Sequence, residues 1–310
     1  MKRPKDLRYY RSFLFAAGAL VALFAAAWFF DRGRPVPAAG TAATSSFEGS
    51  FGASLSADAL PEPAAAKTPG SQPAAVQARA AAAMDLETGT LLYVLQPDLR
   101  WPIASITKLM TAQIILDRMD PDARIVMAPS DFSAGGSGLS ASLEPGDQYR
   151  AEDLLRVLLL PSSNEAAEAF ARTYGRDAFL AAMNSKAAEW GLLHTHFDDP
   201  SGLSAANQST PRELLQLVRR IRLAHPEIFA VTRARTAAVT ELSSGALKQF
   251  PTTNEFAGRA DFLGGKTGTT PEAGDNLVSV FQAGGRIVAT VVFGAADRYA
   301  ATESLLQLIP

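Results

Sequence analysis

A change of composition near residue 77 limits where this chain can form a folded domain. Residues 31–77 are rich in Ala, Pro, Ser, Gly and Thr, as in PVPAAG at 35–40 and PEPA at 61–64. They show no helical or strand periodicity, and such a segment cannot bury enough apolar surface to offset the entropy lost on folding. We therefore predict a disordered tether over 31–77 and a single folded domain over 78–310.

A basic and then apolar segment precedes the tether. The first 11 residues hold five Lys or Arg and one Asp, and residues 12–30 are 19 residues without a charge. As a helix this stretch would rise roughly 28 Å, close to the hydrocarbon thickness of a bilayer. The positive flank predicts that 1–11 stay in the cytoplasm and that the rest is exported. The AAA sequence at 25–27 leaves a cleaved signal peptide open, whereas WFF at 28–30 favours a retained membrane anchor.

Composition excludes several classes of function. The chain has no cysteine, so a thiol nucleophile, a disulfide framework and thiolate metal sites are ruled out. A net charge of −2 gives no indication of nucleic-acid binding. Hydrophobic residues make up 47% of the chain, which is ample for a core.

Strand patterns lie at both ends of 78–310, and helix patterns lie between them. Strands are predicted at 80–84, 91–95, 277–281 and 287–293, the last two on either side of a Gly-Gly turn. Helices are predicted over 105–117, 151–160, 164–173, 177–190, from 210 onward, and over 300–308. This order predicts an α+β sandwich, in which an antiparallel sheet from both chain ends packs on a helical cluster.

Three short motifs follow one another in this domain. They are SITK at 105–108, SSN at 162–164 and KTG at 266–268, and their first members lie 57 and then 104 positions apart. Each alone has a structural interpretation: a helix cap with a solvated lysine, an N-cap, or a glycine-rich turn. Together and in this order they indicate a serine acyl-transfer site whose base is a lysine.

The first motif supplies the nucleophile and the base. Ser105 at a helix start lies where backbone N–H groups and the helix dipole favour developing negative charge. Lys108 is three residues further on the same helix face, within reach of the Ser105 hydroxyl. To act as a base it needs a pKa lowered from ~10.4 toward 7–8, which costs about 4 kcal/mol. Burial and the like charge of Lys266 are expected to supply that shift.

The other two motifs predict proton relay and substrate binding. Ser162 is interpreted as a relay to the leaving amine, and Asn164 as a group that holds Lys108 and a substrate amide. Residues 266–269 are expected on an edge strand, where the side chains bind a substrate carboxylate and the backbone pairs with an extended peptide. The candidate catalytic residues are Ser105, Lys108, Ser162 and Asn164, and the candidate substrate-binding residues are Lys266, Thr267, Gly268 and Thr269.

The motif set resembles that of the serine-type D-alanyl-D-alanine peptidases, the low-molecular-mass penicillin-binding proteins. The likeness runs from about Arg79 to the C-terminus and includes MDLETG at 84–89, LEPGD at 143–147 and DPSGL at 199–203. It implies a β-lactamase/DD-peptidase-like fold and a carboxypeptidase in which the penultimate D-Ala of a cell-wall stem peptide acylates Ser105. The N–H groups of Ser105 and Thr269 would form the oxyanion hole.

The same resemblance implies the partners and the location. Peptidoglycan stem peptides would be the substrate, β-lactams would be covalent inhibitors, and no metal or other cofactor would be needed. The catalytic domain would lie on the periplasmic side of a bacterial cell envelope, attached to the membrane through the N-terminal segment. No nucleic-acid partner is expected.

Other activities are weighed against this one. Only 42 residues follow Gly268, too few for the further C-terminal β domain of many carboxypeptidases, so an endopeptidase that cleaves D-Ala cross-links stays open. A β-lactamase is disfavoured because no deacylating glutamate is recognisable between the second and third motifs. A non-catalytic wall-binding module is disfavoured because no essential motif residue is missing.

The remaining polar candidates carry weaker predictions. His194 and His196 alternate as on a strand, but two ligands without a third are poor evidence of a metal site. A Ser–His–Asp triad through His225 would leave both motif lysines without a role. Arg298 is expected to be a surface arginine at a helix end rather than a contact for the substrate carboxylate.

Overall fold

The computed structural model describes residues 76–133, 135 and 142–309. The predicted cytoplasmic segment and anchor, and the tether up to residue 75, lie outside these residues. Within the described ranges, no helix combines the length and the apolar character needed to span a bilayer.

The strands of the described residues form one five-stranded sheet and three two-stranded sheets. The large sheet has the order β2, β1, β11, β10, β9, and all of its pairs are antiparallel. Its strands are β1 (Ala80–Asp85), β2 (Leu91–Leu95), β9 (Phe262–Thr270), β10 (Gly274–Ala283) and β11 (Arg286–Ala295). The small sheets pair β3 (Trp101–Pro102) with β6 (Gln208–Ser209), β4 (Arg124–Val126) with β5 (Gln148–Arg150), and β7 (Thr236–Thr240) with β8 (Leu247–Pro251).

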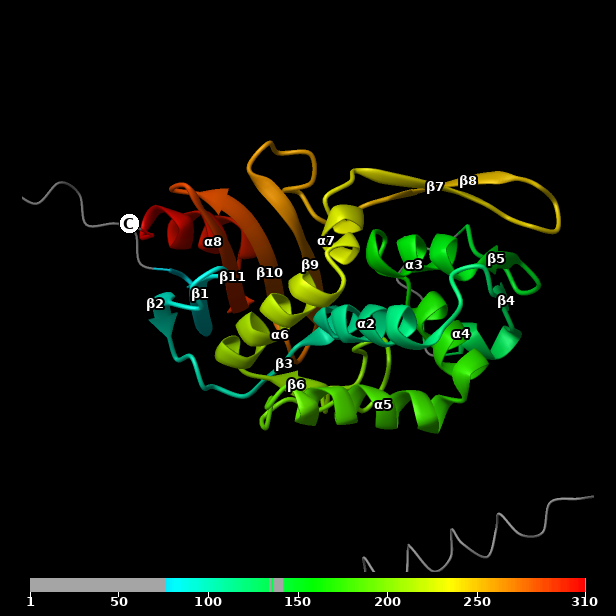
Figure 1. The fold of residues 1–310 in the computed structure, drawn as a ribbon, viewed down its shortest axis with the longest axis horizontal. Coiled ribbons are helices and arrows are strands. Elements are labelled where there is room, and N and C mark those ends of the chain that lie inside the picture. Colours follow the sequence, from blue (N-terminus) through cyan, green and yellow to red (C-terminus); the bar gives the residue numbers. More distant parts are fainter. Residues whose placement is uncertain (1–75, 134, 136–141, 310) are drawn as a thin grey trace, which may run out of the picture. The chain divides into compact units, whose positions relative to one another are not determined.

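Helices occupy most of the chain between the two strand groups (Figure 1). The α-helices are α2 (Lys108–Arg118), α3 (Ala151–Leu159), α4 (Asn164–Tyr174), α5 (Arg176–Glu189), α6 (Pro211–Ala224), α7 (Glu227–Thr232) and α8 (Arg298–Gln307). Two short 3-10 turns are η1 (Ala104–Thr107) and η2 (Pro129–Phe132).

The sheet is built from both ends of the domain, as predicted. Strand β1 pairs with β11 so that Ala82 lies opposite Val291. Strands β10 and β11 are joined by the expected two-residue turn, in which Gly284 and Gly285 have φ of +57° and +76°. Two consecutive positive φ values suit a tight hairpin turn, and glycine adopts them without a steric penalty.

Both faces of the large sheet are covered. On β1, Ala80, Ala82 and Met84 belong to the main core, which the sheet shares with the helical cluster. Ala81 and Ala83 point the other way and pack in a second cluster with Ala301 and Leu305 of α8. Because a strand alternates its side chains, a run of small apolar residues can be buried on both faces.

Helices α6 and α7 and the turn η1 contact the sheet on the face opposite α8. Helix α2 runs behind them through the middle of the helical cluster (Figure 1). Every residue from Lys108 to Ile115 is buried. A helix enclosed in this way holds any polar side chain it carries in a desolvated position, and this sets the chemistry of Lys108.

The β7–β8 ribbon was not predicted. Strand β7 alternates exposed and buried residues, and Ala237 and Val239 are its buried members. The ribbon pairs only with itself and extends beside α3 (Figure 1). Its second strand includes Lys248 and Pro251, residue types that are depleted in strands, and therefore did not stand out from a loop.

Candidate active site

Ser105 lies in the turn η1, directly before α2. The preceding Ala104 has a φ of +48°, which is uncommon for a residue other than glycine. Gly202 packs directly against it, since a Cβ on Gly202 would lie 1.9 Å from the Ala104 carbonyl oxygen. Gly268 of β9 packs on the same turn, where a Cβ would lie 2.7 Å from the Ile103 oxygen. Two glycines therefore allow a loop and the sheet edge to close around Ser105.

Lys108 is fully buried and has three polar partners. Its Nζ lies 2.9 Å from Ser105 Oγ, 2.8 Å from Asn164 Oδ1 and 2.7 Å from the carbonyl oxygen of Ser201. The last two atoms can only accept hydrogen bonds. A neutral amine has two hydrogens and one lone pair, so this arrangement turns its lone pair toward the Ser105 hydroxyl.

The environment of Lys108 favours the neutral amine. Burial lowers the pKa of Lys108 to about 7, and the negative charges of Asp199, Glu165 and Glu168 limit the fall. The like-charge neighbour expected for Lys108 is present, but the repulsion acts on Lys266, and Lys266 is not among the causes of the shift at Lys108. Lys266 is itself buried, and its pKa lies well below the ordinary value.

Lys266 lies on β9, which is an edge strand of the large sheet, as predicted. Only 1% of Lys266 is exposed, and its Nζ donates to Ser162 Oγ at 2.8 Å and to the Thr267 carbonyl oxygen at 3.0 Å. Burial is the main cause of its lowered pKa, and the positive charges of Lys108 and Arg298 add to it. Ser162 is thus held by the second lysine in the way that Ser105 is held by the first.

The second motif combines a structural and a site role. Ser163 is the N-cap of α4, because its side chain accepts a hydrogen bond from the Ala166 N–H at 3.0 Å. Ser162 has a φ of +64°, a costly backbone conformation that clusters at functional sites. The cap at Ser163 thereby leaves Ser162 and Asn164 on either side directed at the two lysines.

Asn164 makes the expected contact with Lys108, and its amide nitrogen, expected to bind a substrate amide, is bonded to the backbone instead. Its Oδ1 accepts from Lys108, and its Nδ2 donates to the carbonyl oxygen of Gly135 at 3.0 Å. A substrate carbonyl that binds the Asn164 amide nitrogen would therefore compete with this backbone contact.

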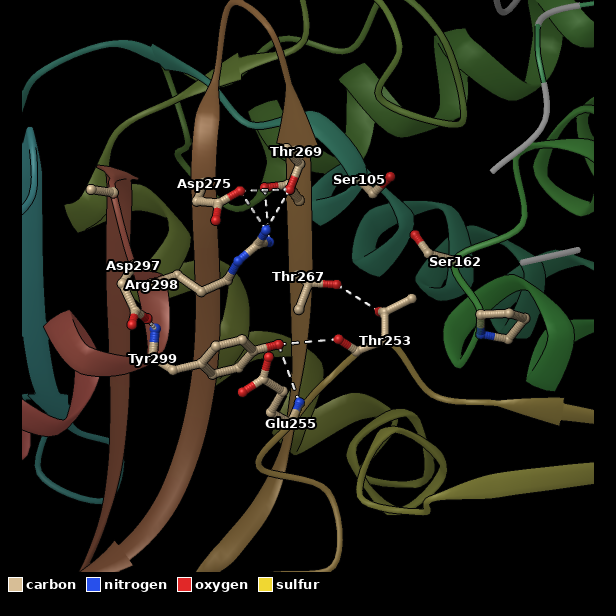
Figure 2. A pocket seen from close by; sticks show the side chains of 13 residues that line it. Ser105, Ser162, Thr253, Glu255, Thr267, Thr269, Asp275, Asp297, Arg298 and Tyr299 are labelled. Carbon is tan, nitrogen blue, oxygen red and sulfur yellow. Dashed lines mark hydrogen bonds and ion pairs between the residues drawn. The ribbon is translucent and has the colours of Figure 1, made fainter. Parts of the chain in front are cut away.

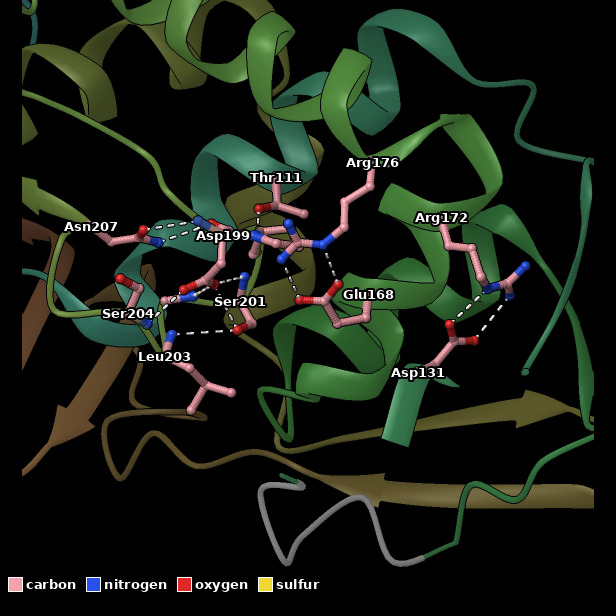
Figure 3. A network of polar contacts seen from close by, with 12 residues as sticks. Thr111, Asp131, Glu168, Arg172, Arg176, Asp199, Ser201, Leu203, Ser204 and Asn207 are labelled. Carbon is pink, nitrogen blue, oxygen red and sulfur yellow. Dashed lines mark hydrogen bonds and ion pairs between the residues drawn. The ribbon is translucent and has the colours of Figure 1, made fainter. Parts of the chain in front are cut away.

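A polar loop that the sequence did not identify as part of the site positions the third partner of Lys108 (Figure 3). Asp199 Oδ1 accepts from the N–H groups of Ser201 and Gly202, each at 2.6 Å, and Oδ2 accepts from the Ser204 N–H at 2.6 Å. Thr111 of α2 donates to the Pro200 carbonyl oxygen at 2.6 Å. These bonds hold the Ser201 carbonyl oxygen against Lys108.

Asn207 ties the same loop to the nucleophile turn. Its fully buried side chain donates to Thr107 Oγ1 at 3.0 Å and to the Asp199 carbonyl oxygen at 2.9 Å. The DPSGL sequence was the available signal, because an Asp followed two residues later by Ser and then Gly is typical of a side-chain-capped turn.

The prediction of a surface position for Arg298 is wrong. Its side chain is only 13% exposed and donates to Thr269 Oγ1 at 2.6 Å and to Asp275 at 2.5 Å, besides the carbonyl oxygens of Gly268 and Asn276. Helix α8 packs on β10 and β11, and from its first residue the Arg298 side chain reaches Gly268 of β9 and Asn276 of β10. Arg298 therefore braces the end of β9 beside the candidate substrate-binding residues.

Ser105, Ser162, residues 267–269 and Arg298 line one cavity of about 500 Å³ (Figure 2). Ser105 and Ser162 lie at one end of it, Thr267, Thr269 and Thr253 along its middle, and Glu255 and Tyr299 at the other end. Its size is typical of pockets for small molecules or peptide segments.

The histidines lie in other hydrogen bonds. His194 contacts Glu213, His196 pairs through its backbone with Gln208, and His225 contacts Asp117 and Glu227. No group of three potential metal ligands occurs among the residues that the structure describes.

Comparison with known proteins agrees with this geometry. Residues 66–297 match the family described as D-alanyl-D-alanine carboxypeptidase. The chain belongs to this family. The predicted family, the DD-peptidase-like fold and the enzyme class are thereby confirmed.

Relatives named as endopeptidases and relatives named as carboxypeptidases both resemble the chain. The D-alanyl-D-alanine endopeptidase of Escherichia coli is 34% identical over 239 residues, 76% of each chain. The D-alanyl-D-alanine carboxypeptidase of a Streptomyces species is 33% identical over 231 residues, 69% of this chain and 79% of the relative. The structure of penicillin-binding protein D2 from Listeria monocytogenes in its ampicillin-bound form has a TM-score of 0.67 at 29% identity, covering 76% of this chain and 98% of that one.

Proposed function

We propose that the protein is a serine-type D-Ala-D-Ala carboxypeptidase that acts on peptidoglycan stem peptides in the bacterial cell envelope. The observation that carries this proposal is the contact between Lys108 Nζ and Ser105 Oγ at 2.9 Å, with acceptor-only atoms on the other two sides of the amine. Such a lysine can take a proton from the serine without giving one up first.

In the acylation step, Ser105 Oγ attacks the carbonyl carbon of the penultimate D-Ala, and its proton moves to Lys108 Nζ. The peptide bond to the terminal D-Ala breaks, and the leaving amine takes a proton through the Ser162 hydroxyl, which Lys266 holds. Water then hydrolyses the ester and restores Ser105. The N–H groups of Ser105 and Thr269 stabilise the oxyanion, and the absence of a side chain at Gly268 permits their approach.

The substrate carboxylate binds along β9, at Lys266, Thr267 and Thr269. Because a nearby anion favours the charged form of an amine, binding raises the pKa of Lys266. Binding of the peptide carboxylate thus favours the charged form of Lys266, and the outer edge of β9, the last strand of the sheet, pairs with the peptide backbone.

A second candidate activity, DD-endopeptidase, is favoured by the relatives that carry this name. The acylation chemistry is the same, and only the leaving group differs. In place of free D-alanine, the released amine belongs to the side chain of a diamino residue in a neighbouring stem peptide.

The proposal also covers inhibition by β-lactams and attachment of the protein to the membrane. The ampicillin-bound form of the Listeria relative supports binding of β-lactams, and the proposed nucleophile that they acylate is Ser105. Attachment to the membrane through residues 12–30 belongs to the same proposal, and fractionation of cells that express the full chain tests it.

Covalent labelling tests the acyl-enzyme directly. The full-length protein is incubated with a fluorescent penicillin, and a labelled band is expected that Ser105→Ala abolishes. An unlabelled parent protein would refute the proposal. Release of free D-Ala from pentapeptide monomers, measured beside conversion of cross-linked dimers to monomers, then separates the two activities.

A further inference from the structure

The cavity that holds Ser105 continues well beyond the position of a D-alanine leaving group. Thr267 and Thr269, of the proposed carboxylate site, lie in its middle, and the cavity extends past them to Glu255 and Tyr299 (Figure 2). A terminal D-alanine carries only a methyl group besides its carboxylate and would occupy a small part of about 500 Å³. The remainder fits a longer leaving group.

The far wall of this cavity is rigid. The Tyr299 hydroxyl donates to the Thr253 carbonyl oxygen and accepts from the Glu255 N–H, both at 3.1 Å. The Tyr299 ring packs edge-on against Phe256 with ring centroids 5.0 Å apart. Thr253 also hydrogen-bonds Thr267 through their hydroxyls at 2.7 Å. The wall is therefore tied to the strand that would bind the substrate.

The far wall also offers a carboxylate to a ligand. Asp275 is paired with Arg298, and Asp297 accepts from the N–H groups at the start of α8. Within the described ranges, the exposed Glu255 side chain has no hydrogen bond or ion pair, although it lines the cavity. A carboxylate in this position accepts hydrogen bonds from amide N–H groups, which free D-alanine lacks and a peptide supplies.

We propose that Thr253, Glu255 and Tyr299 form a leaving-group subsite for cross-linked stem peptides. The aliphatic arm of the diamino residue lies along the Tyr299 ring, and amide N–H groups of its own stem peptide donate to Glu255. The bond that breaks joins the D-Ala carbonyl carbon to the side-chain nitrogen of the diamino residue. That nitrogen leaves as an amine with the proton that Ser162 delivers, and water hydrolyses the acyl-enzyme. This inference rests on the proposed function and names a cross-linked substrate for the same site.

The test compares two substrates and two positions in the full-length protein. Values of kcat/KM are measured for purified cross-linked muropeptide dimers and for pentapeptide monomers. Glu255→Trp fills the far end of the cavity and is expected to lower the dimer-to-monomer ratio of kcat/KM by about tenfold or more. Glu255→Gln keeps the shape and is expected to lower it by about threefold. Glu272→Gln and Glu272→Trp are the matched controls, because Glu272 is also an exposed glutamate but does not line the cavity. Both are expected to keep the parent ratio.

The outcomes separate this inference from the proposed function. A parent protein that binds fluorescent penicillin and releases D-Ala, but leaves dimers intact, overturns the subsite alone. An unchanged ratio in both Glu255 variants also overturns it. If Glu255→Trp fails to fold, the ratio in Glu255→Gln decides. A parent protein that no penicillin labels overturns the proposed function and the subsite with it.

Discussion

The two buried lysines of the candidate site, Lys108 and Lys266, differ in the sign of the charges around them. Lys108 has Asp199 and the glutamates of α4 nearby, which hold its pKa at about 7 against the effect of burial. Lys266 has Lys108 and Arg298 nearby, which lower its pKa further. Burial is the largest cause of the lowered pKa of both lysines. The carboxylates near Lys108 keep its pKa close to neutral pH, so this lysine can exchange a proton there. Lys266 has no such carboxylate among the causes of its shift, and binding of an anion would raise its pKa.

The largest effect should come from removing each lysine in turn. Lys108→Met removes the base and should slow acylation by fluorescent penicillin about 10⁴-fold, the upper range for general base catalysis. Lys266→Met removes a charge-stabilising group and should slow it about 10²- to 10³-fold. Time courses of labelling give both rates, and thermal unfolding shows whether each variant is folded. Equal reductions of the acylation rate in the two variants, or a larger reduction in Lys266→Met, would contradict the different roles proposed for the two lysines.

A substitution in the loop that holds the Ser201 carbonyl oxygen against Lys108 should slow acylation to an intermediate extent. Gly202→Ala puts a methyl group 1.9 Å from the Ala104 carbonyl oxygen at a φ of +89°. The loop must then shift, which moves the Ser201 carbonyl away from Lys108, and acylation should slow by at least about tenfold with a lower Tm.

Gly191→Ala is the matched control for that variant. Gly191 also has a positive φ, of +74°, but a Cβ there meets no atom within 4 Å. Gly191→Ala should lower the Tm slightly, because the positive φ alone costs about 1 kcal/mol for alanine, and it should leave the acylation rate unchanged. A similar slowing in both variants would show that loop packing at Gly202 does not position the base.

The smallest effect should be a shift of the pH profile. Lys108 takes a proton only when it is neutral, so acylation should rise with pH through about 7, with the neutral fraction going from roughly a tenth at pH 6 to nine tenths at pH 8. Glu168→Gln removes a charge that raises this pKa and should move the midpoint to lower pH. Labelling rates between pH 5.5 and 8.5 measure it, beside Glu272→Gln as a control. A midpoint that moves to higher pH would contradict the proposed role of the α4 carboxylates.

Much of the fold could be predicted from local patterns. The cap at Thr210, which accepts from the Glu213 N–H, and the Gly-Gly turn between β10 and β11 both lie where their residue types predicted them. Both features depend on residues that are close together in the chain, so the sequence alone is enough to predict them. The β7–β8 ribbon depends on pairing across an intervening turn, and its residues have no strong preference of their own.

The site divides in the same way. The spacing of Ser105 and Lys108 within one helical turn could be predicted, because helix geometry brings such residues together. The Ser201 carbonyl could not, since every residue has one and only folding selects which one meets Lys108. Arg298 was misassigned because its role depends on how α8 returns over the sheet.

The reactive groups can be identified from residue types and their order in the chain: a serine, two lysines and an asparagine in three ordered motifs, and a family whose name describes its reaction. The pKa values of the lysines and the space for substrate follow from the packing of the fold. Both depend on what surrounds a group in space, because desolvation and the charge of distant residues set a pKa. The unequal surroundings of Lys108 and Lys266, and the cavity that reaches Glu255, come from segments far apart in the chain.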